Sequence, residues 1–205
     1  APYVKDTTML IRGLIKDKKN ILFEGAQGYG LGINTGNYPF VTSSDTTIAG
    51  VFSGFGNIDI GTRIGVVKAY TTRVGNGPFN SELNNALGNK IREKGREYGA
   101  TTGRARRCGW LDLELVKEAI EFNNINETAI TKLDVLSELD CVKIRLSDGS
   151  YKELNSWPQI DPKIKNFEEL PKGAKDYVRL IESDLKVPVT MISIGAERTE
   201  IIFVK

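Results

Sequence analysis

Three arginines on one glycine-containing loop are well suited to bind anions. They lie in residues 101–107, TTGRARR. A guanidinium group holds a carboxylate or a phosphate through two parallel hydrogen bonds. Basic clusters also occur in nucleic-acid-binding segments, but no aromatic side chain is interleaved here and the net charge is only +2. The loop therefore predicts a small anionic ligand, with an RNA-binding domain as the weaker alternative.

A lysine and an aspartate follow the predicted strand at residues 128–132, in the sequence TKLD of residues 131–134. An aspartate there can accept hydrogen bonds from N1–H and the 2-amino group of guanine, a donor pair that adenine lacks, while a lysine stem can lie along the purine face. A surface ion pair explains the same residues. Ser193-Ile194-Gly195 ends a later predicted strand and offers a second wall for the same base, although this triplet alone is not specific.

Two further loops combine small and polar residues. GAQG at residues 25–28 follows a short apolar run and can turn backbone N–H groups and the Gln27 amide toward a ligand. VTSSDTT at residues 41–47 carries five hydroxyl side chains that can donate to phosphate oxygens. A tight turn explains the first loop equally well, and a solvated loop with a helix cap explains the second.

The elements that must position these loops alternate between strands and helices, which predicts an α/β fold with ligand loops at strand ends. We expect helices at 9–15, 89–98, 111–122 and 174–185, and strands at 21–23, 63–72, 128–132, 189–194 and 201–204. Long loops are expected over 28–61 and 99–109. The strands at 141–146 and 151–154 flank Asp148-Gly149, which predicts a β-hairpin.

Composition limits the class of protein. The chain has 205 residues, 40% hydrophobic and 26% charged, as is ordinary for a soluble globular protein. No apolar run approaches the roughly 18 residues of a membrane span, and Cys108 and Cys141 fit no metal spacing, so free thiols in a reducing cytoplasm are expected. Histidine is absent, so any general acid is of another type or lies outside these residues.

Taken together and in order, the motifs resemble the adenylosuccinate synthetase family. The matching stretches are FEGAQG at 23–28, YPFVTSSDTT at 38–47, KAYTTRVGNGPF at 68–79, GATTGRARR at 99–107, GWLD at 109–112, TKLDVL at 131–136 and ISIGAERTE at 192–200. The resemblance implies a mostly parallel, P-loop-NTPase-like sheet flanked by helices, with a C-terminal β-hairpin. It implies a ligase that joins IMP and L-aspartate into adenylosuccinate in purine biosynthesis, using GTP as co-substrate and Mg²⁺.

The resemblance also assigns roles to individual residues. IMP would be bound by Gln27, Thr42, Val74 and Arg104, with Gln27 supporting catalysis at the 6-oxygen. Aspartate would be bound by Ala100, Thr101, Thr102, Gly103, Arg104 and Arg106. GTP would be bound by Arg106, Lys132, Leu133, Asp134, Ser193, Ile194 and Gly195.

Several departures from the family pattern bear on activity. The family's glycine-rich phosphate loop, its catalytic Asp and its catalytic His are absent from these 205 residues, and the Mg²⁺ ligands are expected with them. We therefore interpret residues 1–205 as the C-terminal part of a single domain, cut or processed at its N-terminus, of the shorter archaeal type and inactive by itself. Ala105, Tyr29 and Ile194 replace residues more usual at their positions.

The resemblance further implies a cytoplasmic homodimer that binds neither nucleic acid nor membrane. A second interpretation stays open, in which the chain is a non-catalytic module that binds guanine or inosine nucleotides. The preserved arginine loop favours the ligase, because a simple nucleotide-binding module has no use for a loop that binds aspartate.

Overall fold

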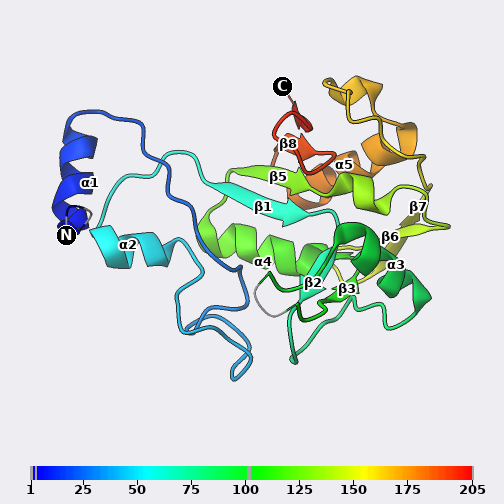
Figure 1. Cartoon of the computed structure of the whole chain (residues 1–205), viewed down its shortest axis with the longest axis horizontal. Coiled ribbons are helices and arrows are strands. Elements are labelled where there is room, and N and C mark those ends of the chain that lie inside the picture. The colour runs from blue at the N-terminus through cyan, green and yellow to red at the C-terminus, as the bar shows by residue number, and fades with distance from the viewer. Residues whose placement is uncertain (1, 3, 101–102, 205) are drawn as a thin grey trace. The chain divides into compact units, whose positions relative to one another are not determined.

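The computed structural model describes residues 2, 4–100 and 103–204, and the chain forms two compact units (Figure 1). The N-terminal unit ends at Gly61 and the C-terminal unit begins at Thr62. Each unit is described by itself below. That residues 1–205 form part of a single domain stays a prediction.

The N-terminal unit is largely irregular and contains two helices, α1 at Thr7–Lys16 and α2 at Ala49–Phe55. The Asp6 carboxylate caps α1 by accepting a hydrogen bond from the backbone N–H of Met9 at 3.0 Å. The predicted helix at 9–15 is thus confirmed, and α2 is a short helix within the predicted loop.

The predicted strand at residues 21–23 is wrong. These residues pair with no neighbouring strand in the described part of the chain, and the Leu22 side chain is 87% exposed. Three apolar residues satisfy the pattern of a buried strand, but a strand is stable only where an adjacent strand takes up its backbone hydrogen bonds.

The C-terminal unit is built on a four-stranded sheet in the order β1-β5-β8-β9. Its strands are β1 at Ile64–Lys68, β5 at Glu127–Thr131, β8 at Val189–Ser193 and β9 at Ile201–Phe203. The first three run parallel, and β9 returns antiparallel to β8. This arrangement confirms the expected α/β fold with a mostly parallel sheet and a C-terminal hairpin.

One face of this sheet forms the hydrophobic core. Ile130, Ile192 and Ile202 lie in one row across β5, β8 and β9 and are at most 1% exposed. Helices α4 at Leu113–Asn123 and α5 at Lys172–Leu185 pack against each other in this unit. The buried Tyr177 hydroxyl of α5 donates to the backbone oxygen of Ala69 at 2.7 Å, which ties α5 to the turn after β1.

Two smaller sheets and a third helix complete the unit. They comprise β2 at Thr71–Arg73 with β3 at Arg107–Gly109, β4 at Leu111–Asp112 with β6 at Val142–Arg145 and β7 at Tyr151–Leu154, and α3 at Ala86–Gly95. Short 3₁₀ helices follow at η1, Leu133–Leu136, and η2, Phe167–Glu169. The predicted hairpin of β6 and β7 is confirmed.

Two predicted boundaries moved for identifiable reasons. Helix α3 begins at Ala86 because the Asn85 side chain caps it by accepting from the Gly88 N–H, and it ends at Gly95, where Arg96 takes a left-handed conformation. The loop predicted over 99–109 contains β3, whose pairing with the distant β2 no local pattern reveals.

No helix among the described residues is long and apolar enough to cross a membrane.

Candidate functional site

The two loops predicted to hold a guanine base meet at one edge of the main sheet. Strands β5 and β8 are parallel neighbours, with Ile130 opposite Ile192, so their carboxyl ends emerge side by side. Lys132 follows β5 directly, and Ser193 is the last residue of β8. The structure therefore brings together two loops that are separated by some sixty residues of sequence.

The first of these loops presents a carboxylate with unused bonding capacity. Lys132 adopts a left-handed conformation, with φ of 61°, that turns the chain from β5 into η1. Leu133 then packs fully into the core, so only its main chain can face a ligand. Asp134 follows, and its Oδ1 atom is buried without a hydrogen-bond partner among the described residues.

Such an atom has an energetic cost that a ligand can offset. A buried acceptor without a partner costs on the order of 1–3 kcal/mol. Burial raises the pKa of Asp134 above its ordinary value and the nearby Glu200 carboxylate adds to that effect, whereas the Asp134 backbone N–H and Lys132 act in the opposite direction. A donor pair such as N1–H and the 2-amino group of guanine would satisfy this carboxylate.

The second loop packs against Glu200, a residue that the sequence did not single out. The Ser193 hydroxyl donates to the Gly195 backbone oxygen at 2.7 Å. A Cβ atom at Gly195 would lie 2.3 Å from Oε2 of Glu200, so this carboxylate occupies the space that a side chain at 195 would need. Oε2 of Glu200 also accepts from the backbone N–H of Glu197 at 2.7 Å. Like Leu133, Ile194 is buried, at 2% exposed, and offers a ligand only its main chain.

The arginine loop is closed by backbone hydrogen bonds at its base. Gly99 donates to the backbone oxygen of Arg104 and Gly103 to that of Gly99, each at 2.8 Å, while Tyr98 and Ala105 form an antiparallel bridge. Gly103 has a φ of 64°, which favours glycine. Ala100 begins the turn, and the predicted site residues Thr101 and Thr102 lie outside the described residues.

Arg104 lies against the loop that follows β2. A Cβ atom on Gly75 would lie 3.7 Å from a guanidinium nitrogen of Arg104. Gly75 adjoins Val74, whose side chain is 54% exposed. The structure thus brings together two residues, Val74 and Arg104, that the family resemblance assigns to the same nucleotide.

Arg107 stabilises the loop that follows β2. Its guanidinium forms an ion pair with Glu82 and donates to the backbone oxygens of Gly75 and Gly77 at 3.2 and 2.9 Å. The Glu82 hydrogen bond raises the pKa of Arg107, and Arg107 in turn lowers the pKa of Glu82. Arg107 therefore organises the loop that carries Val74.

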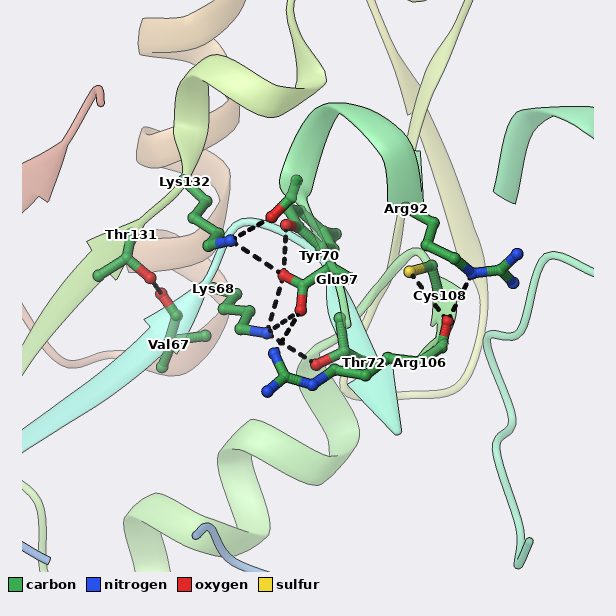
Figure 2. Close-up of polar contacts among 11 residues, drawn as sticks. Val67, Lys68, Tyr70, Thr72, Arg92, Glu97, Arg106, Cys108, Thr131 and Lys132 are labelled. Atoms are coloured by element: carbon green, nitrogen blue, oxygen red, sulfur yellow. Dashed lines mark hydrogen bonds and ion pairs between the residues drawn. The ribbon is translucent and has the colours of Figure 1, made fainter. Parts of the chain in front are cut away.

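The buried carboxylate of Glu97 contacts side chains from two loops (Figure 2). One is the arginine loop, residues 99–107, and the other is the loop that follows β5 from Lys132, called the base loop below. It is 0% exposed and lies between α3 and β3. Its oxygens accept from Lys68 Nζ at 2.9 Å, from Arg106 Nη1 at 2.7 Å and from the Tyr70 hydroxyl at 2.6 Å. Lys132 Nζ lies 3.2 Å away and donates to the Gly95 backbone oxygen at 2.5 Å.

These bonds outweigh the cost of burying the charge. Burial by itself would raise the pKa of Glu97, but hydrogen bonds from Tyr70, Lys68 and Arg106 lower it to about 2. Burial also lowers the pKa of Lys68, and the pairing with Glu97 partly offsets that effect. The sequence gives one local signal of this role: Glu97 is an acidic residue that directly precedes a basic, glycine-containing loop.

Gln27 and Thr42 belong to the N-terminal unit, which brings their loops together. The Ser44 hydroxyl donates to the Gln27 side-chain oxygen at 3.2 Å, and Gln27 has a φ of 59°. The Thr42 backbone N–H donates to the Leu31 oxygen at 2.7 Å. Asp45 orders the end of the hydroxyl-rich loop by accepting from the Thr47 hydroxyl and N–H at 2.6 and 2.9 Å. Gln27 is exposed and Thr42 half-buried, so both are accessible to a ligand.

No group of three carboxylate, cysteine or histidine side chains among the described residues lies close enough together to hold a metal ion.

Comparisons with known proteins show the family to which the chain is similar. The family model described as adenylosuccinate synthetase matches residues 1–147 and 145–202. The adenylosuccinate synthetase of Halothermothrix orenii is 47% identical over 98% of this chain and 52% of its own length. That of Brachyspira hyodysenteriae is 44% identical over 100% of this chain and 53% of its own length. The chain thus spans about half the length of the curated relatives it matches.

Solved structures show the same fold. The fully ligated adenylosuccinate synthetase from Plasmodium falciparum superposes with a TM-score of 0.94 at 38% identity, over 98% of this chain and 54% of that one. The succinoaminodeoxyadenylate synthetase of cyanophage S-2L superposes with a TM-score of 0.65 at 20% identity, over 96% of this chain and 49% of that one. The second likeness concerns the fold alone.

Proposed function

Because the chain belongs to the adenylosuccinate synthetase family, we propose that it contributes the guanine-binding and aspartate-binding loops of a ligase that forms adenylosuccinate from IMP and L-aspartate. GTP would be converted to GDP and phosphate, and Mg²⁺ would be held by residues outside those described here. The observation that carries the proposal is the buried Oδ1 of Asp134, which has no hydrogen-bond partner among the described residues and lies where two strand-end loops meet.

Each described loop has a defined task in this proposal. Asp134 selects guanine, Lys132 lies along its face, and the main chain of Ser193, Ile194 and Gly195 forms the opposite wall. Arg104 binds aspartate and the IMP ribose beside Val74, and Arg106 reaches toward GTP. Gln27 faces the 6-oxygen of IMP, and Thr42 holds its 5′-phosphate.

The positive charge of the arginine loop suits this reaction. Aspartate brings two carboxylates to a site that already holds phosphate groups, and paired guanidinium groups offset that repulsion while orienting the amine for attack. When the loop closes it excludes water, which would otherwise hydrolyse a phosphorylated intermediate. The homodimeric state and the cytoplasmic location remain predictions.

The alternative is a module that binds guanine or inosine nucleotides without turnover. Fragment complementation separates the two functions. The 205-residue chain is mixed with the part of the Halothermothrix orenii protein that it does not match, and adenylosuccinate is followed after adding GTP, IMP, aspartate and Mg²⁺.

Product from the mixture, but from neither part alone, supports the ligase. GDP binding without product in the mixture favours the binding module. Equal affinity of the chain for GDP and ADP contradicts the guanine pocket itself. Product from the chain alone would show that the described residues include the chemical groups that we assign elsewhere.

A further inference from the structure

The carboxylate of Glu97 joins residues from segments that the proposed function assigns to different ligands. Arg106 belongs to the loop proposed to close over aspartate, and Lys132 begins the loop proposed to hold guanine. Both cations contact one buried anion, at 2.7 and 3.2 Å (Figure 2). Glu97 therefore connects the two loops through its side chain. No other ion pair among the described residues joins a side chain of one loop to a side chain of the other.

The geometry of this link favours a positioning role over a merely structural one. The side chains of Lys68, Arg106 and Lys132 are 29, 30 and 37% exposed, whereas that of Glu97 is 0% exposed. The cations thus place one side against Glu97 and keep another side in contact with solvent. Three positive charges face one negative charge, so the exposed side of the cluster attracts anions such as phosphate groups.

Holding these side chains in advance lowers the cost of binding. A free lysine or arginine side chain loses rotamer freedom when a ligand fixes it, and that loss weakens binding. In this fold Glu97 has already fixed Arg106 and Lys132, so a nucleotide meets ordered groups. A glutamine at position 97 keeps the shape but not the charge that holds three cations together.

We propose that Glu97 is a positioning residue that holds Arg106 and Lys132 together, so that nucleotide binding at Lys132 and the position of the Arg106 side chain are energetically coupled. This inference rests on the proposed function for the identity of the ligand. That Glu97 fixes the positions of Arg106 and Lys132 does not depend on the proposed function. The coupling is reciprocal, because any ligand that favours the ordered Lys132 favours the ordered Arg106 by the same factor.

The test uses GDP as the probe, with ADP for comparison, and the complete 205-residue chain. Glu97→Gln is compared with the matched control Glu93→Gln, which removes an exposed carboxylate of α3 that bonds to Tyr98 but touches neither Arg106 nor Lys132. We expect Glu97→Gln to weaken GDP binding about tenfold and Glu93→Gln to leave it unchanged. Unchanged GDP affinity in Glu97→Gln overturns the inference.

A double-mutant cycle distinguishes positioning from general destabilisation. If Glu97 acts through the cations, Arg106→Met and Lys132→Met weaken GDP binding by factors that do not multiply, because each mutation removes one cation from Glu97 and so changes how Glu97 holds the other. Independent, multiplying losses contradict the coupling. This cycle leaves Glu97 in place, so it remains informative if Glu97→Gln does not fold.

A spectroscopic measurement keeps this inference separate from the proposed function. The Lys132 ammonium is expected to give a slowly exchanging ¹⁵N signal in the wild-type chain and in Glu93→Gln. This slow exchange should be lost in Glu97→Gln, where only the bond to the Gly95 backbone oxygen remains to the ammonium group among those described above. If the chain does not distinguish GDP from ADP, the guanine pocket fails while this signal still tests the positioning of Lys132. Retention of the signal in a folded Glu97→Gln variant overturns the role of Glu97 whatever the ligand.

Discussion

At the scale of single residues, Asp134 carries the most specific chemistry in the described chain. Its buried Oδ1 has no partner among the described residues, and the loop after β8 lies beside it. A carboxylate in that position selects a base with two adjacent donors. In the proposed function, the selectivity for guanine therefore resides in the Asp134 side chain, and one substitution there is expected to change it.

We predict that Asp134→Asn lowers affinity for GDP by roughly 10- to 100-fold, because the new amide nitrogen faces the 2-amino donor and a bond to a charged acceptor is lost. Xanthosine diphosphate, whose 2-oxygen can accept from that amide, should recover part of the affinity. Titration calorimetry with GDP, xanthosine diphosphate and ADP measures the change. Equal GDP affinity in the variant and the wild type would refute the assignment of Asp134.

Arg104 carries the second residue-scale prediction. In a preparation that turns over, we expect Arg104→Leu to raise the KM for aspartate by roughly 100-fold and to leave the KM for GTP nearly unchanged, because the lost guanidinium bonds are to a carboxylate. Steady-state kinetics with each substrate varied in turn gives both values. Arg179→Leu, at an exposed position on α5, is the control, and similar losses for both substrates would contradict this division of tasks.

The residues predicted from the sequence differ from those that were missed. The predicted residues are indicated by the sequence next to them, whereas the missed ones depend on partners from distant elements. Lys132 and Asp134 follow β5 and Ser193 ends β8, so the fold class alone predicts that they lie at one edge of the sheet. Glu97 and Glu200 could not be predicted, because their importance comes from partners brought by other elements. The inward packing of Leu133 and Ile194 likewise depends on the core that distant helices complete.

At the scale of elements, the Glu97 cluster joins the end of β1, the segment after α3, the approach to β3 and the end of β5. Local signals sufficed for α1, α4, α5 and the β6–β7 hairpin, where periodicity, caps and Asp148-Gly149 agree. They failed for β3 and for residues 21–23, because strand formation depends on a partner that is remote in sequence.

The Glu97 cluster, in which Lys68, Tyr70, Arg106 and Lys132 surround the carboxylate, predicts that the free energy of unfolding falls in acid. The folded-state pKa of Glu97 is about 2 against an ordinary value of 4.5, so its contribution is complete above pH 4.5 and disappears as the pH falls toward 2. A shift of this size corresponds to about 3 kcal/mol of unfolding free energy. Urea unfolding at pH 5, 4 and 3 should show a shallower decline in Glu97→Gln than in the wild type. Identical pH slopes would contradict this assignment.

At the scale of the whole molecule, the hydrophobic core is distributed unevenly. Its buried members run from Ala69 to Ile202, all within the C-terminal unit. The described residues of the N-terminal unit contribute none of them, and that unit is largely irregular. The expectation of one continuous domain rested on motif order, which carries no information about where apolar side chains are buried.

We therefore predict that hydrogen exchange separates the two units. Backbone amides of residues 4–61 should exchange faster than those of β1, β5 and β8, because amides outside a packed core open with little free energy. Exchange followed by mass spectrometry on the complete chain measures this directly. Equal protection in both units would contradict the prediction, and addition of GDP should protect mainly the C-terminal unit.

The convergence of distant segments on Glu97 has a consequence for the route by which the chain folds. Its partners Lys68 and Tyr70 are 29 and 27 residues away, and Lys132 arrives only when β5 has paired with β1. Pairing of this kind closes a long loop before any contact rewards it. We therefore expect the ion pairs to form after the rate-limiting barrier, and so to slow unfolding while leaving the folding rate almost unchanged.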